Sequence, residues 1–158
     1  EEKQKALEAV RADGTAIREL SLELRGDREV ALAAVRQRGE VLHFVAWELR
    51  GDREVVLAAV RQNGMAIRAA EDKLRLDKDV AMAAVQQDPD ALHHVHAEMQ
   101  ADKDIVMAAV AQKGNALRFA SRKLRADPDV VLAAGEKSSA TFWLAAPKLK
   151  NDPDVATH

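Results

Sequence analysis

Apolar and polar positions repeat along this 158-residue chain with a period of 25 residues. Within each period an aspartate is followed at fixed distances by a β-branched residue, a leucine or methionine, an alanine and a valine. The aspartate column consists of Asp27, Asp52, Asp77, Asp102, Asp127 and Asp152. A strict period between about 20 and 50 residues is typical of proteins built from stacked structural repeats.

Each unit predicts two short helices. In the second unit the aspartate can cap a first helix over about residues 28–38, because its carboxylate accepts hydrogen bonds from the amides of the first turn. We expect Gly39 to end this helix in the left-handed conformation. A second helix is expected over about residues 40–50. Its apolar residues have helical spacing: Val41, Leu42, Val45 and Leu49.

Short connections force such helices into antiparallel hairpins, and stacked hairpins bury a continuous core. We therefore expect an all-α fold: a right-handed α-solenoid of about six 25-residue helix-turn-helix repeats, forming one domain over residues 1–158. The expected repeats are 2–26, 27–51, 52–76, 77–101, 102–126 and 127–151, with a partial repeat at 152–158.

Charge and composition narrow the classes of function. The chain has 24 basic and 26 acidic residues, which disfavours nucleic acid as a partner, because nucleic-acid-binding domains usually carry a net basic surface. No apolar run approaches the roughly 20 residues that span a bilayer, so no transmembrane segment is expected. We expect a soluble protein, intracellular or organellar, and the absence of cysteine excludes thiol chemistry.

One repeat carries a resemblance to a known family. Residues 49–64, LRGDREVVLAAVRQNG, resemble the repeat of domain of unknown function 4116, and residues 116–121, ALRFAS, are similar to the end of that repeat. The resemblance extends over nearly the whole chain, and the last unit departs most, with Gly135 in place of the valine. It implies a helical-repeat fold and brings no activity or catalytic residue. A weaker similarity runs to leucine-rich variant repeats.

The positions that vary between units lie on the outer face of the second helices, where a partner could bind. Aromatic and arginine side chains are the usual anchors of protein interfaces. The candidate partner-binding residues are His43, Phe44, Trp47, Arg68, Arg118, Phe119, Arg122, Trp143 and Leu144. An alternative is that Phe44 and Phe119 only pack against the next unit. One basic residue per repeat forms a ridge on this face: Arg18, His43, Arg68, His93 and Arg118. This ridge either contacts an acidic partner or pairs with nearby acids of the chain.

These features favour a non-catalytic protein–protein interaction scaffold without a cofactor. The recurring aspartates are interpreted as helix caps, since a catalytic acid would not be needed in every repeat. One alternative is a peripheral structural subunit of a large organelle membrane complex, of the photosystem or respiratory type. A second alternative is a metal- or ligand-binding domain at His93 and His96, which are three residues apart on the expected helix. The interpretation we prefer for these histidines is an ordinary surface cluster with no bound metal.

Overall fold

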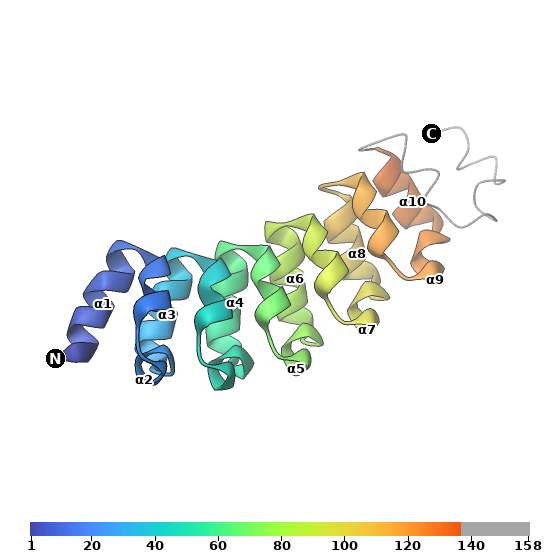
Figure 1. Cartoon of the computed structure of the whole chain (residues 1–158). Helices are drawn as coiled ribbons and strands as arrows, with labels where there is room; N and C mark the ends of the chain where they lie inside the picture. The colour runs from blue at the N-terminus through green and yellow to red at the C-terminus, as the bar shows by residue number, and fades with distance from the viewer. Residues whose placement is uncertain (137–158) are drawn as a thin grey trace.

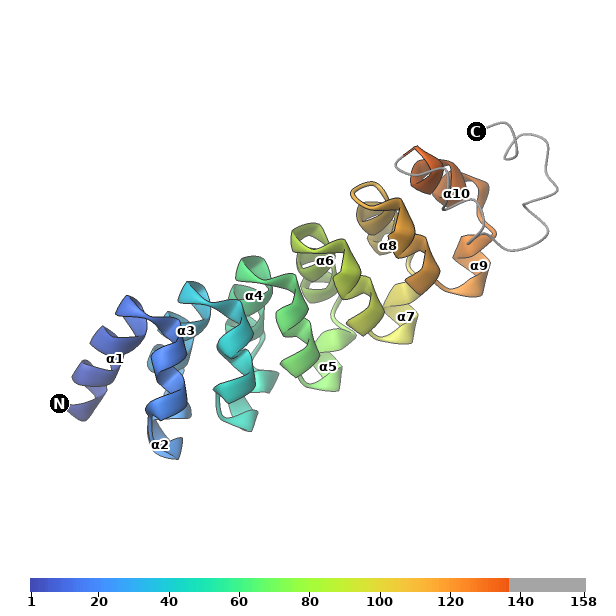
Figure 2. The same cartoon turned by 45° about the horizontal axis from the view of Figure 1, so that its top comes forward.

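The computed structural model describes residues 1–136, and within that range it contains helices and turns without a strand. The helices stack side by side into an elongated array with α1 and α10 at opposite ends (Figures 1 and 2). The all-α repeat fold predicted from the sequence is confirmed. The end of the sixth expected repeat and the partial repeat at 152–158 lie outside the described residues.

The first helix of each repeat is an α-helix, and these helices form one layer of the array. They are α1 (Glu2–Ala12), α3 (Arg28–Gln37), α4 (Arg53–Gln62), α6 (Lys78–Gln87), α8 (Lys103–Val110) and α10 (Pro128–Gly135). The predicted capping is confirmed, because Asp27 accepts a hydrogen bond from the Val30 amide at 3.1 Å. The later aspartates of the column accept two such bonds each: Asp52, Asp77, Asp102 and Asp127.

The second layer differs from the sequence prediction, since a continuous helix over residues 40–50 is wrong. Each unit begins this layer with a 3₁₀ helix: η1 (Gly14–Glu19), η2 (Gly39–Phe44), η4 (Gly64–Ala69), η5 (Pro89–His94) and η6 (Gly114–Phe119). The chain then becomes extended for about two residues and forms one further turn. These turns are α2 (Leu22–Arg25), η3 (Trp47–Gly51), α5 (Asp72–Arg75), α7 (Ala97–Gln100) and α9 (Arg122–Arg125).

In the second to fifth repeats a backbone hydrogen bond to the preceding repeat lies at this break. The amide of Ala46, at the break, donates to the carbonyl of Arg25 in the preceding repeat at 3.1 Å. A continuous helix would use that amide for its own ladder. The same bond recurs at 3.0–3.1 Å in the next three repeats, from Glu71 to Arg50, His96 to Arg75 and Ser121 to Gln100. Each of the four junctions from the first to the fifth repeat therefore has one backbone bond of this kind.

An arginine spans the break from the other side. In the first unit the Arg25 side chain donates from Nε to the Leu20 carbonyl at 3.0 Å and from Nη2 to the Arg18 carbonyl at 2.8 Å. These carbonyls lie at the end of η1 and have no partner within that helix. Gln100 takes over this role in the fourth repeat, donating to the Leu92 carbonyl at 3.0 Å. Arg50 spans the break of the second repeat in the same way, donating to the Val45 carbonyl at 3.3 Å, whereas Arg75 donates to the His94 carbonyl of the next repeat at 2.7 Å.

The glycine column is explained by contact between repeats. The prediction that Gly39 ends a helix in the left-handed conformation is wrong, because no glycine among residues 1–136 has a positive φ. Gly39 is buried at the start of η2, and its backbone lies so close to α4 that a Cβ atom would overlap the Ala59 carbonyl oxygen. At Gly14 the same atom would lie 2.8 Å from the Ala34 oxygen. A side chain is therefore excluded at these positions by the neighbouring helix.

A glutamine at the end of the next first helix bonds to this glycine. The Gly14 amide donates to Gln37 Oε1 at 3.2 Å, and Gly39 and Gly64 donate in the same way to Gln62 and Gln87. Pro89 occupies the glycine position in the fourth repeat and has no amide hydrogen. The matching Gln112 instead donates from Nε2 to the Val85 carbonyl at 3.0 Å.

A ladder of carboxylates and cations joins the starts of neighbouring first helices, at the end opposite to the glycine–glutamine bonds. In each rung a cation at the start of one helix pairs with the capping aspartate of the next helix and with the acid two residues later. Arg53, for example, contacts Asp77 at 2.8 Å and Asp79 at 2.7 Å. The cations are Lys3, Arg28, Arg53, Lys78 and Lys103. The Arg28 guanidinium, hydrogen-bonded to Asp52, holds the pKa of that carboxyl below its ordinary value.

The apolar core lies between the two layers. The predicted stripe of the second unit is confirmed, because Val41, Leu42 and Val45 are buried and Leu49 is half-buried against them. The 3₁₀ layer contributes one fully buried large side chain per repeat: Ile17, Leu42, Ile67, Leu92 and Leu117. Stacking therefore continues one core along the whole described array.

We predict that Gly39→Ala destabilises the protein, because the new methyl group overlaps the Ala59 carbonyl and forces the second and third repeats apart. Overpacking of this kind costs about 1–3 kcal/mol of unfolding free energy. Urea unfolding followed by circular dichroism measures the loss. Gly26→Ala is the matched control, because a Cβ there meets its nearest neighbour at an ordinary 3.5 Å. Equal stability of the two variants would contradict the close-contact explanation.

We also predict that Asp52→Asn lowers stability in a pH-dependent way. Asparagine caps a helix as well as aspartate does, so this change removes chiefly the charge paired with Arg28. The folded-state pKa of Asp52 lies below the unfolded value of about 3.9. The stabilisation is therefore complete above about pH 5 and disappears as the pH falls through the unfolded and then the folded-state pKa. Exposed pairs contribute at most about 1 kcal/mol.

The measurement is urea unfolding of wild type and Asp52→Asn at several values of pH. The difference in unfolding free energy should be largest near neutral pH and should approach zero in acid. Glu8→Gln, on the exposed side of α1, removes one carboxylate outside the ladder and should give no such profile. A difference that stays constant with pH would show that Asp52 acts only as a cap.

Candidate partner-binding site

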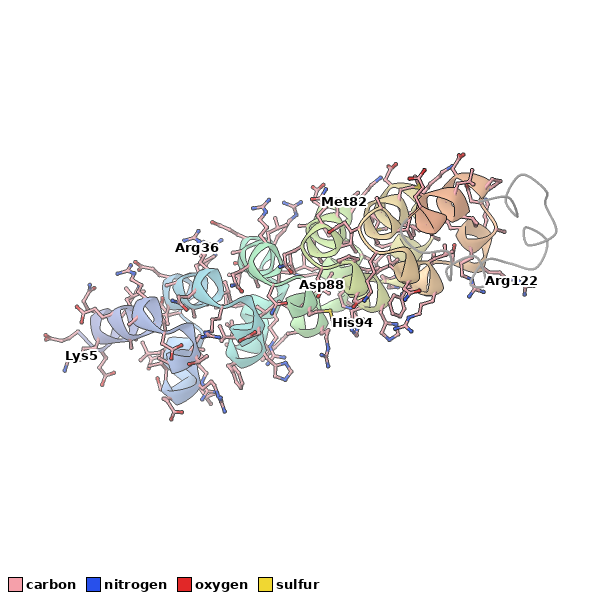
Figure 3. The ribbon with its side chains drawn as sticks, turned by 90° about the horizontal axis from the view of Figure 1, so that it is seen from above. Lys5, Arg36, Met82, Asp88, His94 and Arg122 are labelled. Carbon is pink, nitrogen blue, oxygen red and sulfur yellow. The ribbon has the colours of Figure 1, made fainter. Side chains whose placement is uncertain are left out.

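The outward surface of η1, η2, η4, η5 and η6, together with the turns that follow them, is called the 3₁₀ face below. Figure 3 shows His94 on this layer and Arg36 and Met82 on the layer of first helices. In a 3₁₀ helix, residues three apart lie above one another. The ridge residue of each repeat therefore stacks on the residue one turn earlier, such as His43 on Glu40 or His93 on Asp90.

The structure brings the predicted ridge and the predicted aromatic residues together. The Arg18 guanidinium lies 5.0 Å from the ring centre of Phe44 in the next repeat, in cation–π geometry. His93 lies 4.7 Å from the ring of Phe119, also in the next repeat. Arg118 adds a second cation 4.7 Å from Phe119. Both phenylalanines are half-buried, so they contact the core and keep an edge at the surface.

A shallow depression of about 450 Å³ lies between η2 and η4 on this face. Phe44, Met65 and Ala69 supply its apolar surface, and His43 and Arg68 lie at its exposed side. Glu40 and Asn63 line the other end. The depression thus combines an apolar floor with polar groups of both signs around it, which is typical of sites that bind side chains of a protein partner.

The first residue of each short turn is exposed. Trp47, at the start of η3, has 68% of its surface accessible, and Leu22, in the equivalent position of α2, has 79%. Arg122, at the start of α9, is exposed at the same position. Leu22 was not among the candidate partner-binding residues, although its alignment with Trp47 one period later could have identified it. Trp143 and Leu144 lie outside the described residues.

The histidine cluster has its own local contacts. His96 caps α7, because its Nδ1 accepts a hydrogen bond from the Glu98 amide at 3.1 Å. The rings of His93 and His94 lie 4.8 Å apart, and burial lowers the pKa of His94, with the neighbouring His93 adding to this effect. Within residues 1–136 no group of three or more histidine, aspartate or glutamate side chains is arranged to hold a metal ion.

In the part of the chain that the structure describes, no helix is long and apolar enough to cross a membrane.

Comparisons with known proteins identify the repeat. Neither the comparison with curated proteins nor the comparison with solved structures gives a match. A family model described as "Domain of unknown function (DUF4116)" matches residues 3–50, 52–100 and 102–150, so each match covers two of the 25-residue units. The chain therefore belongs to the DUF4116 family.

Proposed function

We propose that this chain is a non-catalytic scaffold that binds a protein partner through the 3₁₀ face. The observation that carries the proposal is the exposure of Trp47 and Leu22 at equivalent positions of neighbouring repeats. Large exposed apolar side chains that cluster on a surface mark interaction sites. Burial of an exposed tryptophan at an interface is among the largest single contributions to binding.

The aromatic and basic groups nearby support a protein partner. Phe44 and the depression between η2 and η4 adjoin the turn that carries Trp47, so one partner segment can contact all three. Arg18, His43 and Arg68 form the nearby part of the ridge and favour carboxylates on the partner. Glu40 and Asp90 interrupt the positive surface, and the chain has a net charge of −2, which speaks against a nucleic-acid backbone as the ligand.

The carboxylates of the array support a role without catalysis. Asp52 and Asp77 accept amide hydrogen bonds in their own helices and also pair with a cation of the preceding repeat. From Asp27 to Asp127 each carboxylate of this column has equivalent neighbours, an amide of its own helix and a cation of the preceding repeat, as structural groups do. A catalytic acid usually has an environment that differs from that of its structural counterparts.

We predict that Trp47→Ala weakens capture of the partner by tenfold or more, because it removes an exposed interface anchor of roughly 2 kcal/mol. The measurement is quantitative affinity capture from a lysate of the native source, followed by calorimetric titration with the purified partner. Lys5→Ala, on exposed α1, is the matched control and should leave capture unchanged. Circular dichroism should show equal helicity for both variants, since neither side chain is buried.

The proposal is wrong if the partner captured by wild type binds Trp47→Ala and Lys5→Ala equally well. Combining Trp47→Ala with Leu22→Ala extends the test to the neighbouring repeat. A partner contacting both side chains should bind the double variant more weakly than either single variant.

A further inference from the structure

The outward surface of α1, α3, α4 and α6, called the helix-A face below, has a second set of recurring residues. On α3 an acid, a leucine, an alanine and an arginine follow one another at helical spacing along one stripe: Glu29, Leu32, Ala33 and Arg36. The stripe on α4 is the same: Glu54, Leu57, Ala58 and Arg61. Figure 3 shows Arg36 and Met82 along this side of the array.

Three depressions lie in a row on this face, one between each pair of adjacent helices. Their volumes are about 420 Å³ between α1 and α3, 690 Å³ between α3 and α4, and 560 Å³ between α4 and α6. Arg11 and Arg36 line the first, Arg36 and Arg61 line the second, and Arg61 lines the third. The nearly buried side chains of Leu32 and Leu57 contribute to their floors.

The charges on the two edges of this face are not equivalent. Acids at one edge, such as Glu54 and Asp79, already pair with the cations of the ladder. The arginines lie at the other edge. Among residues 1–136, no carboxylate lies within 4.0 Å of Arg11 or Arg61. Arg36 has one carboxylate at this distance, that of Glu54 at 4.0 Å. The available positive charge is therefore concentrated in the arginine row.

The fold itself does not require this row. A cation near the end of a helix is favoured by the helix dipole, which is the simplest explanation for any one of these arginines. However, the equivalent positions in the following repeats are Gln86, Ala111 and Glu136, and the array continues through them. The positive row is thus confined to the first three repeats, and at least one of its arginines lines each of the three depressions.

We propose that the helix-A face binds an extended acidic segment of another protein, about seven residues long, with carboxylates three residues apart. Packed helices lie about 8–10 Å from one another, which sets the spacing of the arginine row. Three residues of an extended polyproline II chain advance about 9 Å. Carboxylates at the first, fourth and seventh positions can therefore reach Arg11, Arg36 and Arg61 in turn. The residues between them lie over the apolar floors of the depressions.

A peptide with four Glu-Pro-Pro triplets tests this spacing, because proline holds the chain extended and places the glutamates on one side. Its fluorescein-labelled form is titrated with the full chain and followed by fluorescence anisotropy. A second peptide has the same composition with its four glutamates consecutive. Wild type should bind the spaced peptide about tenfold more tightly than the clustered one, and added salt should weaken the binding.

Two double variants with the same change in net charge distinguish a contact at the arginine row from a general attraction by the overall charge. Arg36→Gln with Arg61→Gln should lose binding of the spaced peptide by about tenfold or more, since two charge-assisted contacts are removed. Glutamine is a suitable replacement because Gln86 occupies this position in the fourth repeat. Lys5→Gln with Lys123→Gln removes two exposed cations that line none of the three depressions, and this variant should bind within about twofold of wild type. Circular dichroism verifies that both remain folded.

Three results would overturn the proposal. Failure of wild type to bind either peptide at millimolar concentration would show that the site is absent. Equal weakening by the two double variants would show that the overall charge attracts the peptide. Equal affinity for the spaced and clustered peptides would show that the spacing of the arginines is not recognised. None of these results bears on the 3₁₀ face, whose test uses Trp47.

Discussion

From the second to the fifth repeat, the break in the second helix carries a backbone hydrogen bond to the repeat before it. The amide of Ala46 donates to the Arg25 carbonyl, and the same bond recurs in the three following repeats. The second layer consists of 3₁₀ helices and separate short turns, and the exposed carbonyls at the ends of the 3₁₀ helices accept from side-chain donors such as Arg25. The break also determines where Trp47 lies, since the residue after it begins a new turn at the surface.

The remaining contacts between repeats lie at opposite ends of the first helices, with the apolar core between them. The carboxylate ladder joins the starts of these helices, and the glycine–glutamine bonds join their ends to the 3₁₀ helix of the preceding repeat. Pro89 changes one junction, where Gln112 donates a hydrogen bond in place of accepting one. The helix at that junction, α8, ends at Val110, while α3, α4 and α6 each end at a glutamine. The array therefore tolerates a local change at one contact while the other contacts maintain the stacking.

The sequence predicts those features that are local or strictly periodic. The 25-residue period, the aspartate caps and the buried stripe at Val41, Leu42 and Val45 all followed from the pattern of residues. The helix break did not, because apolar residues three and four apart suit a 3₁₀ helix plus a turn as well as a continuous α-helix. Gly39 was misinterpreted because the atom that excludes a side chain, the Ala59 oxygen, belongs to another repeat. The candidate residues on the 3₁₀ face were chosen by their variability, which gave no information about the arginine row on the constant helices.

The carboxylate ladder has a consequence for arrays of different length. Each rung sets two carboxylates against one cation, so every repeat added to the array contributes about one excess negative charge to the same edge. At physiological ionic strength the Debye length is about 8 Å, close to the roughly 8–10 Å between packed helices. A rung is therefore repelled mainly by its immediate neighbours. The electrostatic cost per repeat stays nearly constant as the array grows, and repulsion along this edge sets no upper limit on the number of repeats.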